Sequence, residues 1–331
     1  MPDSKLTVAV TGPTGTFGFG LMPLLQADER IGSVVGIARR PFDASEHGWP
    51  KMTYRQGDVR DPAALAKAFE GADVVVHLAF MITGAASRDT IREINVEGTL
   101  NVFRAAVAAG ARRFVYASSV AAYGFHRDNP VGMTEEWPTR PAAHLFYAQE
   151  KAEIERLLEQ EATGQDGPQV FLLRPAIVLG PDAVGGKDIV PGPIAPLLRR
   201  LVGLMERVRL PMVSPPVPIQ FIHEADVGQA FLLCIVGGGQ PGVYNITGDG
   251  VLSGAQILRE LGLTPIPAPT LVLRTAARGC AALPFAPPFT EWAEAFTHPA
   301  IMDASKAKQH LGWRPRYSSL EALRATLRSS A

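Results

Sequence analysis

Two side chains near the middle of the chain are suited to proton transfer at a carbonyl group. Tyr147 and Lys151 lie four positions apart in a helix-forming stretch, so their side chains share one face of that helix. A phenol has a pKa of about 10, which is poorly matched to proton transfer at neutral pH, and an ammonium one turn away lowers that pKa. Hydride transfer between a nicotinamide and a carbonyl needs such a proton donor, because an alkoxide develops. The pair therefore predicts acid/base catalysis.

Ser118 and Ser119 stand where a predicted strand ends, shortly before this helix. Ligands of parallel sheets lie beyond the carboxyl ends of the strands, where a serine hydroxyl can donate to a developing oxyanion. Only one of the two serines can occupy that catalytic position. The alternative is that they only cap or turn the chain.

A glycine-rich turn follows the first predicted strand, Leu6–Val10, and opens a predicted helix, Gly18–Leu25. Its glycines allow a close approach of the backbone to a pyrophosphate, and the start of the helix offers unpaired N–H groups. The spacing, G-x-x-G-x-x-G, is one residue longer than the usual dinucleotide-binding pattern, and a plain tight turn is the alternative. We expect the cofactor site to include Gly12, Thr14, Gly15, Thr16, Phe17 and Gly18.

The end of the second predicted strand bears on the choice between NAD and NADP. NAD-binding folds usually carry an acidic residue there, whereas this chain carries Arg39 and Arg40. Two guanidiniums favour a 2′-phosphate and hence NADP, unless they are solvated surface charges. Asp43 lies close by and could bind the ribose hydroxyls instead, so NAD is the alternative cofactor. Asp58 follows the third predicted strand, where it either accepts a hydrogen bond from the adenine amino group or serves a turn.

The elements predict an α/β fold, with a doubly wound parallel Rossmann sheet and a smaller C-terminal substrate-binding domain. Continuous apolar runs, typical of strands buried on both faces, alternate with helix-forming segments. The predicted strands are Leu6–Val10, Ser33–Ala38, Met52–Gln56, Val74–Ala79, Phe114–Ser118 and Val170–Arg174, and the helices are Gly18–Leu25, Pro62–Phe69, Arg92–Ala109 and Ala143–Gln160. We expect residues 1–175 to form the dinucleotide-binding domain and residues 176–331, which contain several proline clusters, to form mainly the substrate domain.

Composition argues against several other classes of protein. Basic and acidic residues balance at 32 each, so no overall field attracts nucleic acid or an anionic membrane. Cys234 and Cys280 are too few for a disulfide framework or a zinc site, and we expect no metal. Without a signal-peptide pattern or a bilayer-spanning run, we expect a cytoplasmic protein that acts on a small molecule. The apolar stretch Thr270–Pro288 is interpreted as a pocket lid or packed helix rather than a membrane-surface element.

The order of these motifs resembles that of the extended short-chain dehydrogenase/reductases, also called the NAD-dependent epimerase/dehydratase family. The resemblance covers nearly the whole chain and rests on Thr11–Gly18, Gly57–Val59, His77–Ala79, Asn95–Thr99, Ser118–Gly124, Tyr147–Lys151, Leu173–Pro175, Phe221–His223 and Asp303–Pro315. It implies that Ser119 is the catalytic serine and that Lys151 also binds the nicotinamide ribose. It extends the cofactor site to Asp58, Val59, Leu78, Ala79, Phe80, Tyr147, Lys151 and Pro175. It also implies that residues 217–240 return to the Rossmann sheet.

The family resemblance further implies a homodimer, paired through the helices predicted at Arg92–Ala109 and Ala143–Gln160. The second helix carries Leu145, Ile154, Leu157 and Leu158 around more than one face. This indicates apolar surface beyond what one core contact needs.

Departures from the family pattern favour its reductase and hydroxysteroid-dehydrogenase branches. Dehydratases usually carry Thr-Asp-Glu where this chain has Ser119–Ala121, and epimerases commonly have an Asn-rich segment where it has Ala176–Pro181. Positions beside the motifs predict a mostly apolar substrate pocket containing Met81, Ser119, Phe125, His126, Ala176 and Ile177, with Phe80 beside it. The first hypothesis is an NADP-dependent oxidoreductase for the carbonyl or secondary alcohol of a small hydrophobic substrate. The alternatives are a sugar-nucleotide epimerase, which would bind the diphosphate through Arg199, Arg200, Arg207 and Arg209, and a non-catalytic NADP-sensing protein.

Overall fold

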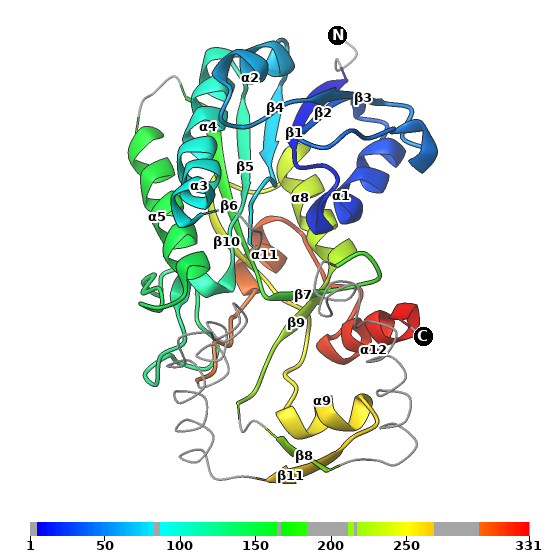
Figure 1. The fold of residues 1–331 in the computed structure, drawn as a ribbon, viewed down its shortest axis with the longest axis vertical. Helices are drawn as coiled ribbons and strands as arrows, with labels where there is room; N and C mark the ends of the chain where they lie inside the picture. Colours follow the sequence, from blue (N-terminus) through cyan, green and yellow to red (C-terminus); the bar gives the residue numbers. More distant parts are fainter. Residues whose placement is uncertain are drawn as a thin grey trace.

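A seven-stranded parallel sheet forms the centre of the protein (Figure 1). The structure is a computed structural model that describes residues 5–82, 87–163, 167–183, 211–214, 217–267 and 298–330. The strands run in the order β10-β6-β5-β4-β1-β2-β3, and every neighbouring pair is parallel. Their bounds are β1 Leu6–Thr11, β2 Ile31–Ala38, β3 Met52–Gln56, β4 Val74–His77, β5 Arg113–Ala117, β6 Gln169–Pro175 and β10 Gly242–Ile246. This confirms the predicted doubly wound Rossmann sheet.

Helices cover both faces of the sheet, because its strands bury alternate side chains on opposite sides. On one face, Val8 and Val10 pack with α1 (Thr16–Ala27) and α8 (Glu224–Ile235), which lie side by side in Figure 1. On the other face, Ala9 belongs to the core formed with α2 (Pro62–Phe69), α4 (Gly98–Ala108) and α5 (Phe146–Glu161). Two separate hydrophobic cores therefore fix the sheet from both sides.

The helix predicted over Arg92–Ala109 is interrupted near its start. It consists of α3 (Arg88–Arg92), a wide π turn η2 (Glu93–Glu97) and then α4. The π turn contains the buried Asn95, whose side chain exchanges two hydrogen bonds with the backbone of Met81, at 2.7 and 2.9 Å. This amide fixes the segment that follows β4 to the start of α4.

The C-terminal half contributes both to the sheet and to a smaller region beyond it (Figure 1). After β6 the chain forms β7 (Ile177–Leu179), which pairs with β9 (Phe221–His223), and then α8 and β10 return to the sheet. The smaller region contains β8 (Pro211–Ser214) paired with β11 (Thr264–Pro267), and α9 (Gly254–Glu260). Within the segment 217–240 that the family leads us to expect at the sheet, α8 packs against the sheet. The strand that joins the sheet, β10, follows this segment at residues 242–246. Where the two domains divide remains a prediction.

The last part of the chain is anchored beneath α8 by a buried carboxylate. Asp226 accepts hydrogen bonds from the backbone N–H groups of Arg316 and Tyr317, at 3.0 and 3.1 Å, and its carbonyl accepts one from the Trp313 indole. The short helices α11 (Ser305–His310) and α12 (Ser319–Ser330) flank this anchor. Within the residues that the structure describes, no helix has the length and apolar character needed to cross a bilayer. The stretch Thr270–Pro288 lies outside the described residues.

Candidate active site

A cavity of about 340 Å³ opens at the carboxyl ends of β1, β4, β5 and β6. Its lining brings together the three predicted catalytic residues, the glycine loop and most of the predicted substrate pocket. Among the predicted residues that line it are Gly12, Gly15, Thr16, Phe17, Leu78, Phe80, Ser119, Phe125, Tyr147, Lys151, Pro175, Ala176 and Ile177. Binding at this edge is typical of open parallel α/β sheets.

The glycine loop leaves one wall of the cavity as bare backbone. Gly12 has a φ of 69°, and a Cβ atom there would lie 2.8 Å from the backbone of Ala79. At Gly18, a Cβ atom would lie 2.0 Å from the carbonyl oxygen of Pro13. Gly15, the N-cap of α1, has room for a Cβ atom, which would lie 3.6 Å from the Gly12 carbonyl oxygen, and no side chain caps this helix start. Gly12 and Gly18 therefore shape the loop, whereas Gly15 leaves the positive end of the helix accessible to a phosphate.

Tyr147 and Ser119 meet at the opposite wall. Ser119 is the N-cap of the short 3₁₀ helix η3 (Val120–Tyr123), and its hydroxyl accepts a hydrogen bond from the N–H of Ala121 at 3.1 Å. Burial raises the pKa of the Tyr147 phenol above its ordinary value, and the hydrogen bond between Tyr147 and Ser119 opposes part of this increase. Tyr147 is therefore protonated at neutral pH, ready to donate to a substrate oxygen.

Lys151 lies one helical turn further along α5 and is almost completely buried. Its ammonium donates to the carbonyl of Ala117 at 2.6 Å and to the hydroxyl of Tyr116 at 3.1 Å. The Nζ atom also lies 3.7 Å from the ring centroid of Phe80 and 5.8 Å from that of Tyr147. A cation at this distance favours the phenolate form of Tyr147.

The structure separates the two adjacent serines. Ser119 lines the cavity, whereas Ser118 is wholly buried beside it. The Ser118 hydroxyl donates to the carboxylate of Glu155, which also forms an ion pair with Arg174. Ser118 is thus held in the protein interior, and Ser119 is the serine that can meet a substrate.

The predicted adenosine-binding residues lie at the ends of β2 and β3. Arg39 and Arg40 are exposed, and the Arg39 guanidinium is near enough to Asp58 to help lower the pKa of that carboxyl, after the larger effect of its hydrogen bond to Arg60. Asp43, the alternative ribose ligand, accepts hydrogen bonds from the N–H and hydroxyl of Ser45, at 2.8 and 2.6 Å. The Asp43 carboxylate therefore already stabilises the local turn at Ser45.

Several predicted residues lie beside the cavity without lining it. His126 directs its Nε2 atom to the carbonyl of Arg140, so its ring is part of the packing behind Gly124. Met81 is held through its backbone by Asn95. The other predicted site residues that are absent from the described lining are Thr14, Gly18, Val59 and Ala79, together with Arg39, Arg40 and Asp58 at the adenosine edge.

Four lining residues were not among the predicted site residues: Ile82, Val120, Ala121 and Val178. Ile82, Val120 and Val178 are next in sequence to a predicted pocket residue, and Ala121 is two positions from Ser119, which is the signal that could have found them. All four are apolar, so they extend the hydrophobic character of the pocket.

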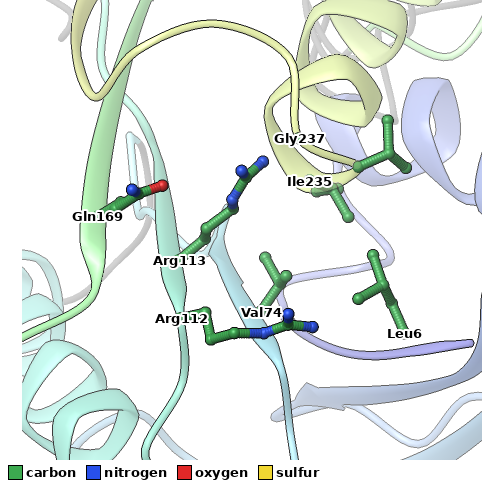
Figure 2. A pocket seen from close by; sticks show the side chains of 8 residues that line it. Leu6, Val74, Arg112, Arg113, Gln169, Ile235 and Gly237 are labelled. Carbon is green, nitrogen blue, oxygen red and sulfur yellow. The ribbon is translucent and has the colours of Figure 1, made fainter. Parts of the chain in front are cut away.

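A second hollow, of about 460 Å³, lies at the opposite edge of the sheet (Figure 2). It is lined by Arg112, Arg113 and Gln169 near the starts of β5 and β6, and by Ile235 and Gly237 at the end of α8. The two guanidiniums are engaged with Asp73 and with the carbonyl of Cys234, at 3.0 and 2.8 Å. Its described lining contains none of the predicted catalytic residues, which line the cavity at the carboxyl ends of the strands.

Comparisons with known proteins agree on one family. The model of the "NAD dependent epimerase/dehydratase family" matches residues 8–247. An uncharacterized protein of Sinorhizobium fredii, y4nG, is 30% identical over 329 residues, covering 96% of this chain and 76% of that protein. Human 3 beta-hydroxysteroid dehydrogenase type 7 is 38% identical over a shorter stretch of 131 residues, which covers 36% of this chain and 34% of that enzyme.

Solved structures agree on the fold. UDP-glucose 4-epimerase of Thermotoga maritima, with UDP-glucose, superposes with a TM-score of 0.74 at 20% identity, covering 98% of both chains. The dTDP-glucose 4,6-dehydratase of Bacillus anthracis, in complex with NAD, has a TM-score of 0.72 at 16% identity, covering 98% of this chain and 96% of that one. At these identities the likeness concerns the fold alone.

Proposed function

Because the chain belongs to the NAD-dependent epimerase/dehydratase family, we propose that it is an NADP-dependent oxidoreductase. Its substrate is a ketone or aldehyde, or the corresponding alcohol, carried by a small hydrophobic molecule. The observation that carries this proposal is the cavity at the strand ends. Ser119, Tyr147 and Lys151 meet there, and the rest of its described wall is mostly apolar.

The residues present fit a dinucleotide. Gly15 and the uncapped start of α1 leave room and N–H donors for the pyrophosphate, and the family resemblance assigns Lys151, which lines the same cavity, to the nicotinamide ribose. When bound, the nicotinamide supplies or accepts the hydride. In reduction, Tyr147 donates its proton to the substrate oxygen, and Ser119 donates a hydrogen bond that stabilises the charge developing there.

The substrate side of the cavity favours an apolar molecule. Phe80, Ile82, Val120, Phe125 and Ile177 contribute apolar surface. Among the described residues of the lining, Lys151 is the sole cationic side chain, so a charged substrate group would find few charge-assisted hydrogen bonds there. The local similarity to a hydroxysteroid dehydrogenase supports the same substrate class.

The preference for NADP rests on the end of β2. Arg39 and Arg40 are exposed there, and the Asp43 carboxylate is occupied by Ser45. A 2′-phosphate beside two guanidiniums gains charge-assisted hydrogen bonds that a 2′-hydroxyl cannot form.

Turnover measured with NADPH and NADH across a panel of carbonyl compounds tests the proposal. The panel contains aliphatic, aromatic and polycyclic ketones and aldehydes, with UDP-glucose as a separate substrate. We expect reduction of apolar carbonyls, faster with NADPH. Epimerisation of UDP-glucose without net reduction would support the epimerase alternative, whose predicted diphosphate ligands Arg199, Arg200, Arg207 and Arg209 lie outside the described residues. Tight NADPH binding without turnover of any compound would support a cofactor-sensing protein.

A further inference from the structure

We infer that Glu155 is a positioning residue of the catalytic set, and that its buried carboxylate, held by Ser118 and Arg174, is the fixed countercharge of the Lys151 ammonium. This inference rests on the proposed roles of Tyr147 and Lys151. Tyr147, Lys151 and Glu155 follow one another at intervals of four residues along α5, so all three project from one face of the helix.

The carboxylate of Glu155 is fully partnered although it lies in the protein interior. The Ser118 hydroxyl donates to its Oε1 atom, and Arg174 donates to both oxygens through Nε, at 3.0 and 3.2 Å, and to Oε2 through Nη2. Glu155 is 3% exposed and Arg174 is 4% exposed. This set of donors holds the buried carboxylate in one defined position.

This ion pair joins the segments that form the walls of the active site. Ser118 directly precedes Ser119, and Arg174 directly precedes Pro175, which lines the cavity. The Arg174 guanidinium also lies 4.5 Å from the ring centroid of Tyr123, whose hydroxyl donates to Asn245 of β10 at 2.8 Å. A shift of Glu155 would therefore be transmitted to the serine, to the lysine and to the pocket wall together.

The charges around Lys151 show why a countercharge is needed. Burial lowers the pKa of the Lys151 ammonium well below its ordinary value, and Glu155, followed by Glu150, opposes that decrease. The other titratable groups that face Lys151 are the neutral phenols Tyr116 on β5 and Tyr147 on α5, and His77 on β4. His77 is uncharged, because burial and the Lys151 charge lower its pKa to about 3.

Loss of the Glu155 charge should therefore act on Tyr147 through Lys151. A less cationic Lys151 stabilises the Tyr147 phenolate less, so the pKa of Tyr147 in the cofactor complex increases. Alcohol oxidation requires the phenolate, and its rate increases with pH through that pKa. In Glu155→Gln we expect this limb of the kcat profile to move to higher pH by about one unit, with a smaller change in KM.

Four variants separate the charge from general stability. Glu155→Asp keeps the carboxylate and should leave the limb near its wild-type position, even if the melting temperature falls. Glu153→Gln is the matched control, because this half-buried carboxylate on the same helix pairs with Arg92. If Glu155→Gln does not fold, because it leaves Arg174 unpaired, the double variant with Arg174→Gln removes both buried charges and should show the same alkaline shift. Tyr147→Phe reports on the proposed function itself.

The inference is overturned if the limb of folded Glu155→Gln, or of the double variant, coincides with that of the wild type while Tyr147→Phe is inactive. It is also overturned if Glu153→Gln moves the limb as far as Glu155→Gln. If the wild type turns over no carbonyl compound, the proposed function fails separately. Ultraviolet difference titration of the Tyr147 phenolate with NADP bound, referenced to Tyr147→Phe, then still measures the expected increase in pKa.

Discussion

At the scale of single residues, the proposed reaction depends on the proton of the Tyr147 phenol. Tyr147→Phe removes that proton and leaves the ring in place, so we expect cofactor binding to persist while kcat decreases by roughly 10²- to 10⁴-fold. In the wild type, reduction should slow and oxidation should accelerate as the pH increases through the Tyr147 pKa, which burial raises. Steady-state kinetics across pH and a cofactor titration check both statements. A variant with near-normal kcat at saturating substrate would remove Tyr147 from the mechanism.

Ser119→Ala should reduce kcat less than Tyr147→Phe, because the hydroxyl stabilises charge without transferring the proton. The neighbouring Ser118→Ala should act mainly on stability, since Ser118 is buried on Glu155. Thermal melts beside kinetics distinguish the two serines. A larger kinetic loss in Ser118→Ala would reverse the assignment.

The preference for NADPH over NADH is also expected to depend on single residues. If Arg39 meets a 2′-phosphate, that charge-assisted contact is worth about 1.5–3 kcal/mol, so NADPH should bind roughly ten to a hundred times more tightly than NADH. Arg39→Ala should remove most of this difference by weakening NADPH, and added salt should reduce it, because the side chain is exposed. Calorimetric titration of both cofactors measures it. Arg40→Ala is the matched control, with a smaller expected effect, and equal affinities in the wild type would contradict the prediction.

At the scale of elements, the loop between β1 and α1 offers a comparison between two glycines. Gly18→Ala forces a Cβ atom to within 2.0 Å of the Pro13 carbonyl oxygen, so we expect a large loss of thermal stability. Gly15→Ala meets its nearest atom at 3.6 Å and has a permitted backbone conformation, so the protein should fold normally. Its new methyl group, however, faces the space expected for the pyrophosphate, so cofactor affinity should fall. Melting curves and cofactor titrations check the pair, and an unstable Gly15→Ala with normal affinity would refute the assignment.

The sequence predicted the strands and helices as far as β6, because apolar strand runs and helix-forming segments obey local rules, whereas the seventh strand, β10, was not predicted. The six predicted strands and the order of the motifs agree with the sheet, and the cavity gathers Gly12, Ser119, Tyr147 and Lys151. Features that depend on distant partners escaped prediction. The wide turn at Asn95 exists because its amide serves the backbone of Met81, and His126 turns to the carbonyl of Arg140. Neither partner can be recognised from periodicity or spacing.

At the scale of the whole molecule, a homodimer through α4 and α5 remains a prediction. Leu145, Ile154 and Leu158 are fully buried in one chain, so they do not supply the apolar surface on which the sequence argument depended. The exposed parts of these helices instead carry Val107 and the ion pairs of Arg92 with Glu153 and Arg104 with Glu161. The expectation of a dimer at micromolar concentration therefore rests on the family resemblance, and added salt should weaken such a dimer if these charged groups contribute to its interface. Light scattering at low and high salt measures it, and a monomer at both would contradict the prediction.

The order in which the sheet is made has a consequence for synthesis on the ribosome. The strand β10 pairs with β6, although about 66 residues separate them. At roughly 5–20 residues per second, translation of that interval takes about 3–13 s. During this time the nascent chain carries β6 as an open sheet edge, which can pair with a strand of another nascent chain. Arg174 and Glu155 can already meet in that period, whereas the bond from Tyr123 to Asn245 cannot. In the newly made chain, the ion pair that holds α5 to β6 can therefore form before β10 covers the open edge of β6.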